Sequence, residues 1–169
     1  MSAKKMLVVY MAGTNAVIGV ATRRAAGAPT VADLVGAGLP VRSPTSESGV
    51  AVPADNLAVK EVDYSDDAVR QPLLHGLDTS GAVVQITPTI SSVTCTSTKI
   101  TINLSPAVAA DKMAIVIVDA GPNRAPLKFT AKTVAATTVD VTVTGVPPGT
   151  HDVFASVDGY VSKVDTGSF

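Results

Sequence analysis

Two histidines, one cysteine and a short run of acidic residues are the side chains of this chain that could do chemistry. Nucleophilic catalysis needs a Ser, Thr or Cys beside a histidine that a carboxylate orients. His75 and His151 lie in different halves of the sequence, so their positions favour no shared site. Cys95 stands in the alternating run SVTCTST, which favours a small apolar residue in a strand. The sequence therefore predicts no catalytic residue.

The run DYSDD has the first part of the spacing found in a calcium-binding loop. Asp63, Ser65 and Asp67 occupy its first, third and fifth positions. The sixth position is Ala68 instead of glycine, and the twelfth is Leu74 instead of glutamate, so the turn residue and the bidentate ligand are missing. The same residues suit a helix start, where Ser65 caps the first turn and acidic residues follow. We expect the helix start and no metal site.

The N-terminal run LVVYMAGTNAVIGVA could open a nucleotide-binding fold. Such a fold needs G-x-G-x-x-G or a Gly-Lys-Ser/Thr phosphate loop, and neither occurs, since five residues separate Gly13 from Gly19. The chain after Thr87 also lacks the alternation of strands and helices that this fold requires. We expect a β-hairpin here and no bound cofactor.

The composition favours a packed core and a covered surface. Hydrophobic residues make up 46% of the chain and charged residues only 16%, so part of the surface is expected to meet another chain. The net charge of −1 offers no basic patch for nucleic acid. Aromatic residues are 4% and Trp is absent, which gives few faces for stacking on sugars. A single cysteine allows no internal disulfide.

The run KKMLVVYMAG is similar to the start of a secretion signal, with basic residues before apolar ones. Gly13, Thr14 and Asn15 interrupt the apolar run. No apolar run approaches the roughly 18 residues that cross a bilayer. We expect synthesis in the cytoplasm without a cleaved signal peptide, and no membrane span.

Hydrophobic patterns in residues 1–85 predict a β-rich domain. Residues 6–11 and 16–22 predict the two strands of a hairpin. Residues 56–62 predict a third strand, and residues 81–86 a strand that leads out of the domain.

Capping and breaking residues predict the connections between these strands. Thr30 with Asp33 predicts a capped helical turn that Gly36 ends. Residues 39–55 contain three prolines and predict a long loop. His75 stands next to a glycine, and this pair predicts that His75 is a turn residue.

Residues 86–169 predict a second domain, an Ig-like β-sandwich, so the fold class is mainly β. About six or seven short runs of β-branched residues alternate here with turn signals. Residues 99–105 place three apolar side chains on one face of a strand. Residues 113–119 are almost all apolar, which predicts a central strand buried on both faces.

The stretch VPPGTHDVFASVDGY predicts a corner of this sandwich. Two prolines and a glycine form a tight turn, and an alternating strand follows. That strand places His151 with the inward valines and Phe154 on the opposite face. A second turn comes next. The predicted corner residues are Pro147, Pro148, Gly149, His151, Gly159 and Tyr160.

This stretch resembles the PPGTYTVTVSADGY-type run of bacterial Ig-like and prealbumin-like modules, which include carboxypeptidase-regulatory-like and PEGA-type repeats. The resemblance covers roughly residues 86–169 and implies a spacer, adhesin or decoration. His151 stands where those modules have tyrosine, whose hydroxyl bonds the backbone at such a corner. One ring nitrogen of histidine can make the same bond, so we expect a corner residue and no catalytic or metal-binding role.

These features favour a non-enzymatic structural component of a phage capsid or tail, or of a phage-tail-like particle. Its N-terminal half would dock into the assembly, and the sandwich would decorate or brace it. Expected partners are copies of the chain and other particle proteins, in a virion or extracellular particle, with no small-molecule substrate. Phe154 is expected either under a loop or against another subunit. The expected assembly contacts are a strand that pairs with a neighbour and two apolar anchors: Met6, Leu7, Val8, Val9, Tyr10, Met11, Phe154 and Phe169.

Two other functions stay open. A carbohydrate- or protein-binding adhesin module would use the loops at residues 120–126 and 146–151. A small enzyme would need a pocket in the N-terminal half that holds His75 with Asp66 or Asp67.

Overall fold

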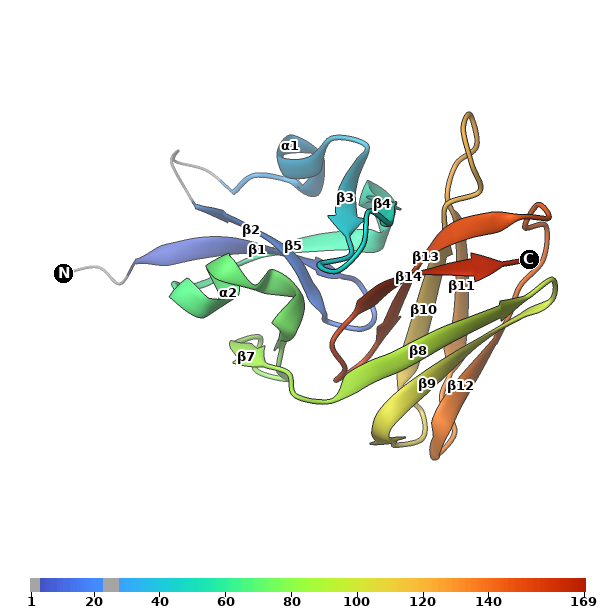
Figure 1. Ribbon diagram of the computed structural model, residues 1–169. Helices are drawn as coiled ribbons and strands as arrows, with labels where there is room; N and C mark the ends of the chain where they lie inside the picture. Colours follow the sequence, from blue (N-terminus) through green and yellow to red (C-terminus); the bar gives the residue numbers. More distant parts are fainter. Residues whose placement is uncertain (1–3, 23–27) are drawn as a thin grey trace.

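The computed structural model describes residues 4–22 and 28–169. Strands hold 55% and helices 10% of the chain, which confirms the predicted mainly β fold. The strands form two parts that lie side by side, with the N-terminus on one part and the C-terminus on the other (Figure 1). We call residues 4–85 the N-terminal half and residues 89–168 the sandwich.

A three-stranded antiparallel sheet is the centre of the N-terminal half. Its order is β2 (Val17–Thr22), β1 (Lys5–Met11), β5 (Leu57–Asp63), so the predicted hairpin and third strand are confirmed. Successive side chains of β1 point to opposite faces. Met6 and Val8 lie in a cluster on one face, and Val9 and Met11 in a cluster on the other.

Both faces of this sheet are covered. One face packs against α1 (Val31–Val35) and the hairpin of β3 (Gly38–Arg42) and β4 (Gly49–Pro53). The other packs against α2 (Asp66–Arg70) and the two-stranded sheet of β6 (His75–Leu77) and β7 (Val83–Gln85). Two short 3-10 turns complete this half: η1 (Ala54–Asn56) and η2 (Pro72–Leu74). The strand predicted at residues 81–86 is therefore present but shorter.

The loop predicted at residues 39–55 is wrong, because β3 and β4 form a hairpin there. Val41, Val50 and Val52 are buried, and the residues between them are more exposed, which is the alternation of a strand. Pro40 pairs opposite Ala51. In a two-stranded ribbon a proline costs no hydrogen bond when its nitrogen faces outward, so the prolines here are compatible with strands.

The predicted helix starts are confirmed. Thr30 and Asp33 form a capping box at α1, and Gly36 ends the helix with a φ of +62°. The Ser65 hydroxyl accepts a hydrogen bond from Ala68 N at α2. DYSDD is therefore a helix start, and Asp63 pairs instead with Lys5 at 2.6 Å.

Replacing Thr30 by Ala is expected to raise the pKa of Asp33 toward its ordinary value. Hydrogen bonds from the Thr30 hydroxyl, and then from its backbone N–H, hold the pKa of that carboxyl below its ordinary range. A depressed folded-state pKa gives stability that is present at neutral pH and lost as the pH falls through it. An NMR titration of the Asp33 carboxyl measures the shift, and Thr30→Ser is the control that should keep the low pKa. An unchanged pKa in Thr30→Ala would contradict the capping box as its cause.

The sandwich consists of two antiparallel sheets with one apolar core between them. The order in the first is β12 (Ala136–Thr142), β9 (Lys99–Val108), β8 (Thr89–Thr96). The order in the second is β11 (Leu127–Lys132), β10 (Met113–Val118), β13 (Thr150–Val157), β14 (Lys163–Ser168). Ile100, Ile102 and Leu104 of β9 point into the core, as predicted.

Strand β10 is buried on both faces for a reason that its composition does not reveal. Ala114, Val116 and Val118 face the sandwich core, as expected. Ile115 and Ile117 face the N-terminal half. The predicted central strand is confirmed, and its second face belongs to the contact between the two parts.

One corner of the sandwich closes where β8 and β14 run side by side. An isolated parallel bridge joins Thr89 to Val161, and Lys163 Nζ donates a hydrogen bond to Ser91 O at 2.7 Å. Further along, Cys95 lies against Gly167. The last strand of the sheet is therefore partly covered by β8.

Replacing Gly167 by Ala is expected to lower the free energy of unfolding by about 1–3 kcal/mol. The new methyl group would lie 2.7 Å from Cys95 Cβ, closer than packed carbon atoms approach. Urea unfolding followed by circular dichroism measures the loss. The same substitution in a Cys95→Gly background should cost less, and an equal cost there would show that the collision is not the cause.

Candidate functional site at the seam between the halves

The contact between the two halves, which we call the seam, has an apolar cluster of its own beside those of the sandwich and of the N-terminal sheet's other face. Each part contributes buried apolar side chains, and β4 and the turn after β1 lie over the outer face of β10 and β13. The seam cluster consists of Val9, Met11, Ile18, Val41, Val50, Val52 and Leu57 from the N-terminal half, and Ile115, Ile117, Phe154 and Val164 from the sandwich.

Buried hydroxyl groups cross the seam beside this cluster. Thr14 Oγ1 and Ser156 Oγ are 2.7 Å apart, and Ser162 Oγ donates to Ser156 Oγ at 3.1 Å. Gly49 N donates to Asp152 Oδ2 at 2.8 Å. Buried polar groups that satisfy one another fix one relative position of two packed surfaces. The seam therefore has a defined register.

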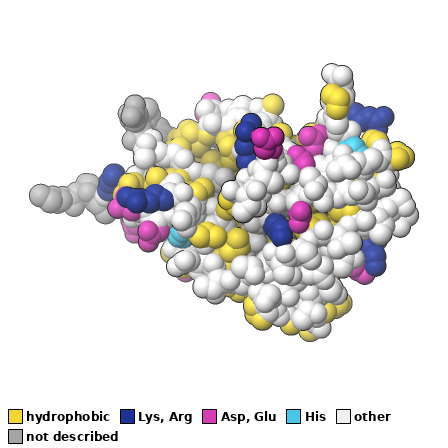
Figure 2. Space-filling view, in the orientation of Figure 1, with side chains coloured by type: hydrophobic (Ala, Val, Ile, Leu, Met, Phe, Trp, Pro, Cys, Tyr) yellow, Lys and Arg dark blue, Asp and Glu magenta, His cyan; other side chains and the backbone are white. Residues whose placement is uncertain are grey.

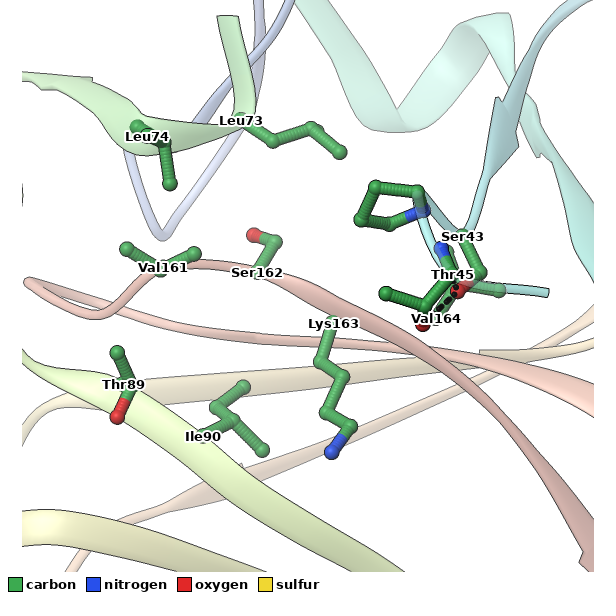
Figure 3. A pocket seen from close by; sticks show the side chains of 11 residues that line it. Ser43, Thr45, Leu73, Leu74, Thr89, Ile90, Val161, Ser162, Lys163 and Val164 are labelled. Atoms are coloured by element: carbon green, nitrogen blue, oxygen red, sulfur yellow. Dashed lines mark hydrogen bonds between the residues drawn. The ribbon is translucent and has the colours of Figure 1, made fainter. Parts of the chain in front are cut away.

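An apolar pocket of 220 Å³ opens at one end of the seam (Figure 3). Leu73 and Leu74 lie on one side, and Val161 lies opposite, above Ile90. Lys163 Nζ at its edge is held by Ser91 O and by Asp165 at 3.5 Å. The full lining is Ser43, Pro44, Thr45, Leu73, Leu74, Thr89, Ile90, Val161, Ser162, Lys163 and Val164.

A polar groove lies between the β3–β4 hairpin and the end of the sandwich. Arg42 and Glu47 line it from the hairpin, and Asp119 and Asp152 line it from the sandwich. Asp119 Oδ1 accepts a hydrogen bond from Gly121 N at 3.0 Å, so this carboxylate also orders the loop after β10. The groove brings together both signs of charge next to one of the loops that an adhesin would use.

The predicted corner has the expected bond. His151 Nε2 lies 3.0 Å from Pro147 O, so the ring meets the backbone of the turn formed with Pro148 and Gly149. The ring also lies 5.8 Å from that of Phe169, which packs partly buried against the sandwich core. His151 therefore has the geometry of a structural residue.

Tyr160, another of the predicted corner residues, lies beyond the other end of β13 and also bonds the backbone. Tyr160 follows Gly159, which has a φ of +85°, and its hydroxyl donates to Pro106 O at 2.9 Å. Burial raises the pKa of Tyr160. This hydrogen bond joins the last turn of the chain to the end of β9, 54 residues earlier in the sequence.

Two of the predicted assembly contacts are wrong. The strand at residues 6–11 is β1, which has β2 on one side and β5 on the other, so its backbone cannot pair with another chain. Phe154 is 0% exposed and belongs to the seam cluster, so this chain's own N-terminal half covers it. Both errors have one cause, since the partner of each segment lies far away in the sequence.

The turn predicted at His75 is also wrong. This residue begins β6, is 6% exposed, and has Nδ1 3.0 Å from Gln71 O. Asp66 Oδ1 accepts a hydrogen bond from Tyr64 at 2.8 Å. An enzyme site built on these residues would need a histidine open to substrate, and burial gives His75 little access.

Two absences hold for the part of the chain that the structure describes. No group of three or more His, Cys, Asp or Glu side chains there could hold a metal ion. Across residues 4–22 and 28–169, no helix has the length and apolar character to cross a membrane.

Sequence reasoning missed the seam, although a signal for its sandwich side was present. An outward isoleucine at 115 and another at 117 are unusual on a strand whose other face already fills a core. Thr14 and Ser156 gave no signal, because a single hydroxyl residue in a turn or strand predicts no partner.

One comparison with known proteins gives a family. No curated protein matches the chain. A family described as "Domain of unknown function (DUF8756)" matches residues 82–168, which include all seven strands of the sandwich and slightly more than half of the sequence. The chain therefore belongs to the DUF8756 family.

Proposed function

We propose that this protein is a non-enzymatic structural component of a phage capsid or tail, or of a phage-tail-like particle. In this proposal the N-terminal half docks into the assembly, and the sandwich, similar to Ig-like modules, decorates or braces it. The phage assignment rests on analogy with particles that use such modules. The proposed location is a virion or extracellular particle, after synthesis in the cytoplasm.

The seam is the observation that carries this proposal. Apolar side chains from five strands of the N-terminal half and three strands of the sandwich interlock there, and buried hydroxyls fix their register. A contact of this kind transmits force between two parts better than a flexible linker does. Two halves joined rigidly in this way suit a bracing subunit, whose two ends must keep a constant relative position.

The available surfaces favour contacts other than those expected from β1. β2 and β5 are the two end strands of their sheet, and we propose that strand pairing with a neighbour uses β5. The face of the sandwich formed by β8, β9 and β12 shows few charged side chains (Figure 2). Uncharged faces cost less to bring together than charged ones.

Light scattering behind a sizing column, over a range of concentrations, tests this proposal. Rings or polymers, seen as a mass in solution above the 17.1 kDa of one chain, would support it. When the protein is then mixed with purified particles from a phage-producing culture, it should sediment with them. A monomer that stays in the supernatant in both experiments would overturn it.

A second candidate is a carbohydrate- or protein-binding adhesin module, which the polar groove favours. Carboxylates and a guanidinium group in one groove are the groups that bind vicinal hydroxyls. This function predicts a monomer that a glycan array retains. Arg42→Ala and Asp152→Ala should abolish retention, and Lys5→Ala, outside the groove, should keep it.

A further inference from the structure

The loop between β10 and β11, residues 119–126, projects from the end of the sandwich (Figure 1). Its tip is a turn, in which Arg124 N donates a hydrogen bond to Gly121 O at 3.3 Å. The Arg124 side chain is exposed, and it has no hydrogen bond or ion pair with any residue that the structure describes. The loop therefore carries a free guanidinium group at its far end.

The base of this loop borders the polar groove, whose charge is mainly negative. Asp119, Asp152 and Glu47 line the groove against a single cation, Arg42. One carboxylate oxygen of Asp119 and one of Asp152 accept hydrogen bonds from backbone N–H groups. Their second oxygens, and both oxygens of Glu47, have no hydrogen-bond partner within residues 4–22 and 28–169. The groove therefore offers several free acceptors to a cationic group of another molecule.

The loop is stiff, which keeps its tip away from its base. Asp119 Oδ1 accepts a hydrogen bond from Gly121 N at 3.0 Å, and Pro122 and Pro126 fix two further φ angles. Arg124 accordingly forms no ion pair with the groove of its own chain in the described structure. An ordered loop loses little conformational entropy when it binds, so the same stiffness favours a contact with a second molecule.

We propose that two copies of the chain associate by laying these loops side by side in opposite directions. The tip of each loop then meets the base of the other, and one two-fold axis relates the two contacts. Each Arg124 guanidinium enters the groove of the second copy and donates hydrogen bonds to the free oxygens of its carboxylates. Opposite charges at the tip and the base of one loop make this surface complementary to itself, and a second copy satisfies both ends at once.

The contact is small and exposed to solvent, so the dimer is expected to be weak and sensitive to salt. It closes at two copies and leaves β5 free, so it neither needs nor excludes the particle assignment. Sedimentation velocity should show more dimer as the protein concentration rises in about 0.01 M salt, and a loss of that dimer in about 1 M salt, where charges are screened over short distances. A chain that stays monomeric in low salt, whether or not a glycan occupies the groove, would overturn the proposal.

Charge substitutions identify the groups in contact. Arg124→Gln should raise the dissociation constant of the dimer at least about tenfold, because both contacts lose their cation. Glu47→Gln should raise it less, since Asp119 and Asp152 keep their charges. Lys128→Gln is the matched control, because it removes an equal charge from an exposed residue of the neighbouring strand β11 and should leave the dissociation constant unchanged. Equal dissociation constants for Arg124→Gln and Lys128→Gln would overturn the proposal.

A cross-link between two chains locates the contact. Arg124→Lys keeps the charge and places an amine at the tip, and a carbodiimide joins an amine to a touching carboxylate as an amide, while the reagent takes up water and becomes a urea. Unlabelled and isotope-labelled chains are mixed in equal amounts before the reaction, and mass spectrometry maps the joined peptides. We expect position 124 to be joined to Glu47, Asp119 or Asp152, with about half of these pairs mixed in label. Joined peptides of a single label only, or none from position 124, would contradict the contact between two copies.

Discussion

Replacing Phe154 by Ala is expected to lower the free energy of unfolding of the whole chain by about 3–5 kcal/mol. This ring is fully buried in the seam cluster, opposite Ile117 on β10 and Val164 on β14. Its removal leaves a cavity that both halves line, so both lose packing contacts. Because the halves share this cluster, we expect one unfolding transition before and after the change.

Urea unfolding followed by circular dichroism and by tyrosine emission checks this result. Tyr10 and Tyr64 report on the N-terminal half, and Tyr160 reports on the sandwich. Val134→Ala is the matched control, since an exposed apolar side chain should change stability by no more than about 0.5 kcal/mol. Two separate transitions, or a loss in Phe154→Ala equal to that of the control, would contradict the coupling through the seam.

The thiol of Cys95 is expected to react with a disulfide reagent about a hundredfold more slowly in the folded chain than in urea. Burial first, and then the nearby Asp165 carboxylate, raises the pKa of this thiol from 9.0 to about 11. The thiolate is the reactive form, so its fraction at neutral pH falls by the same factor. The absorbance of the released thiol gives both rates.

Asp165→Asn separates the two causes of this slow reaction. Removing the carboxylate should restore only a small part of the reactivity, because burial contributes more to the raised pKa. Equal rates for the folded and unfolded chain would show that the corner between β8 and β14 is open to solvent.

Local patterns in the sequence predicted those parts of the fold that neighbouring residues determine. The alternation in residues 99–105 predicted the inward face of β9, because a strand with one buried face repeats every two residues. Thr30 with Asp33, and Ser65, predicted two helix starts, because each cap bonds a backbone group within one turn. His151 was predicted to bond the backbone of its own turn, and Pro147 is only four residues away.

The parts that sequence reasoning missed depend on distant partners. Residues 39–55 form a hairpin because β10 and β13 offer a face for Val50 and Val52 to cover. Without that face, three prolines in a polar context indicate a loop. β1 could be predicted as a strand, but its place between β2 and β5 depends on a segment about fifty residues away. The particle assignment and the remaining anchor, Phe169, stay predictions.

The seam also has a consequence for the order in which the chain is made. On the ribosome the whole N-terminal half emerges first, while Phe154 and Val164, which complete the seam cluster, emerge close to the end. At about 5–20 residues per second, the N-terminal side of the seam waits for several seconds or more for its sandwich side. The nascent N-terminal half therefore exposes the apolar side chains of the seam until β13 and β14 have emerged.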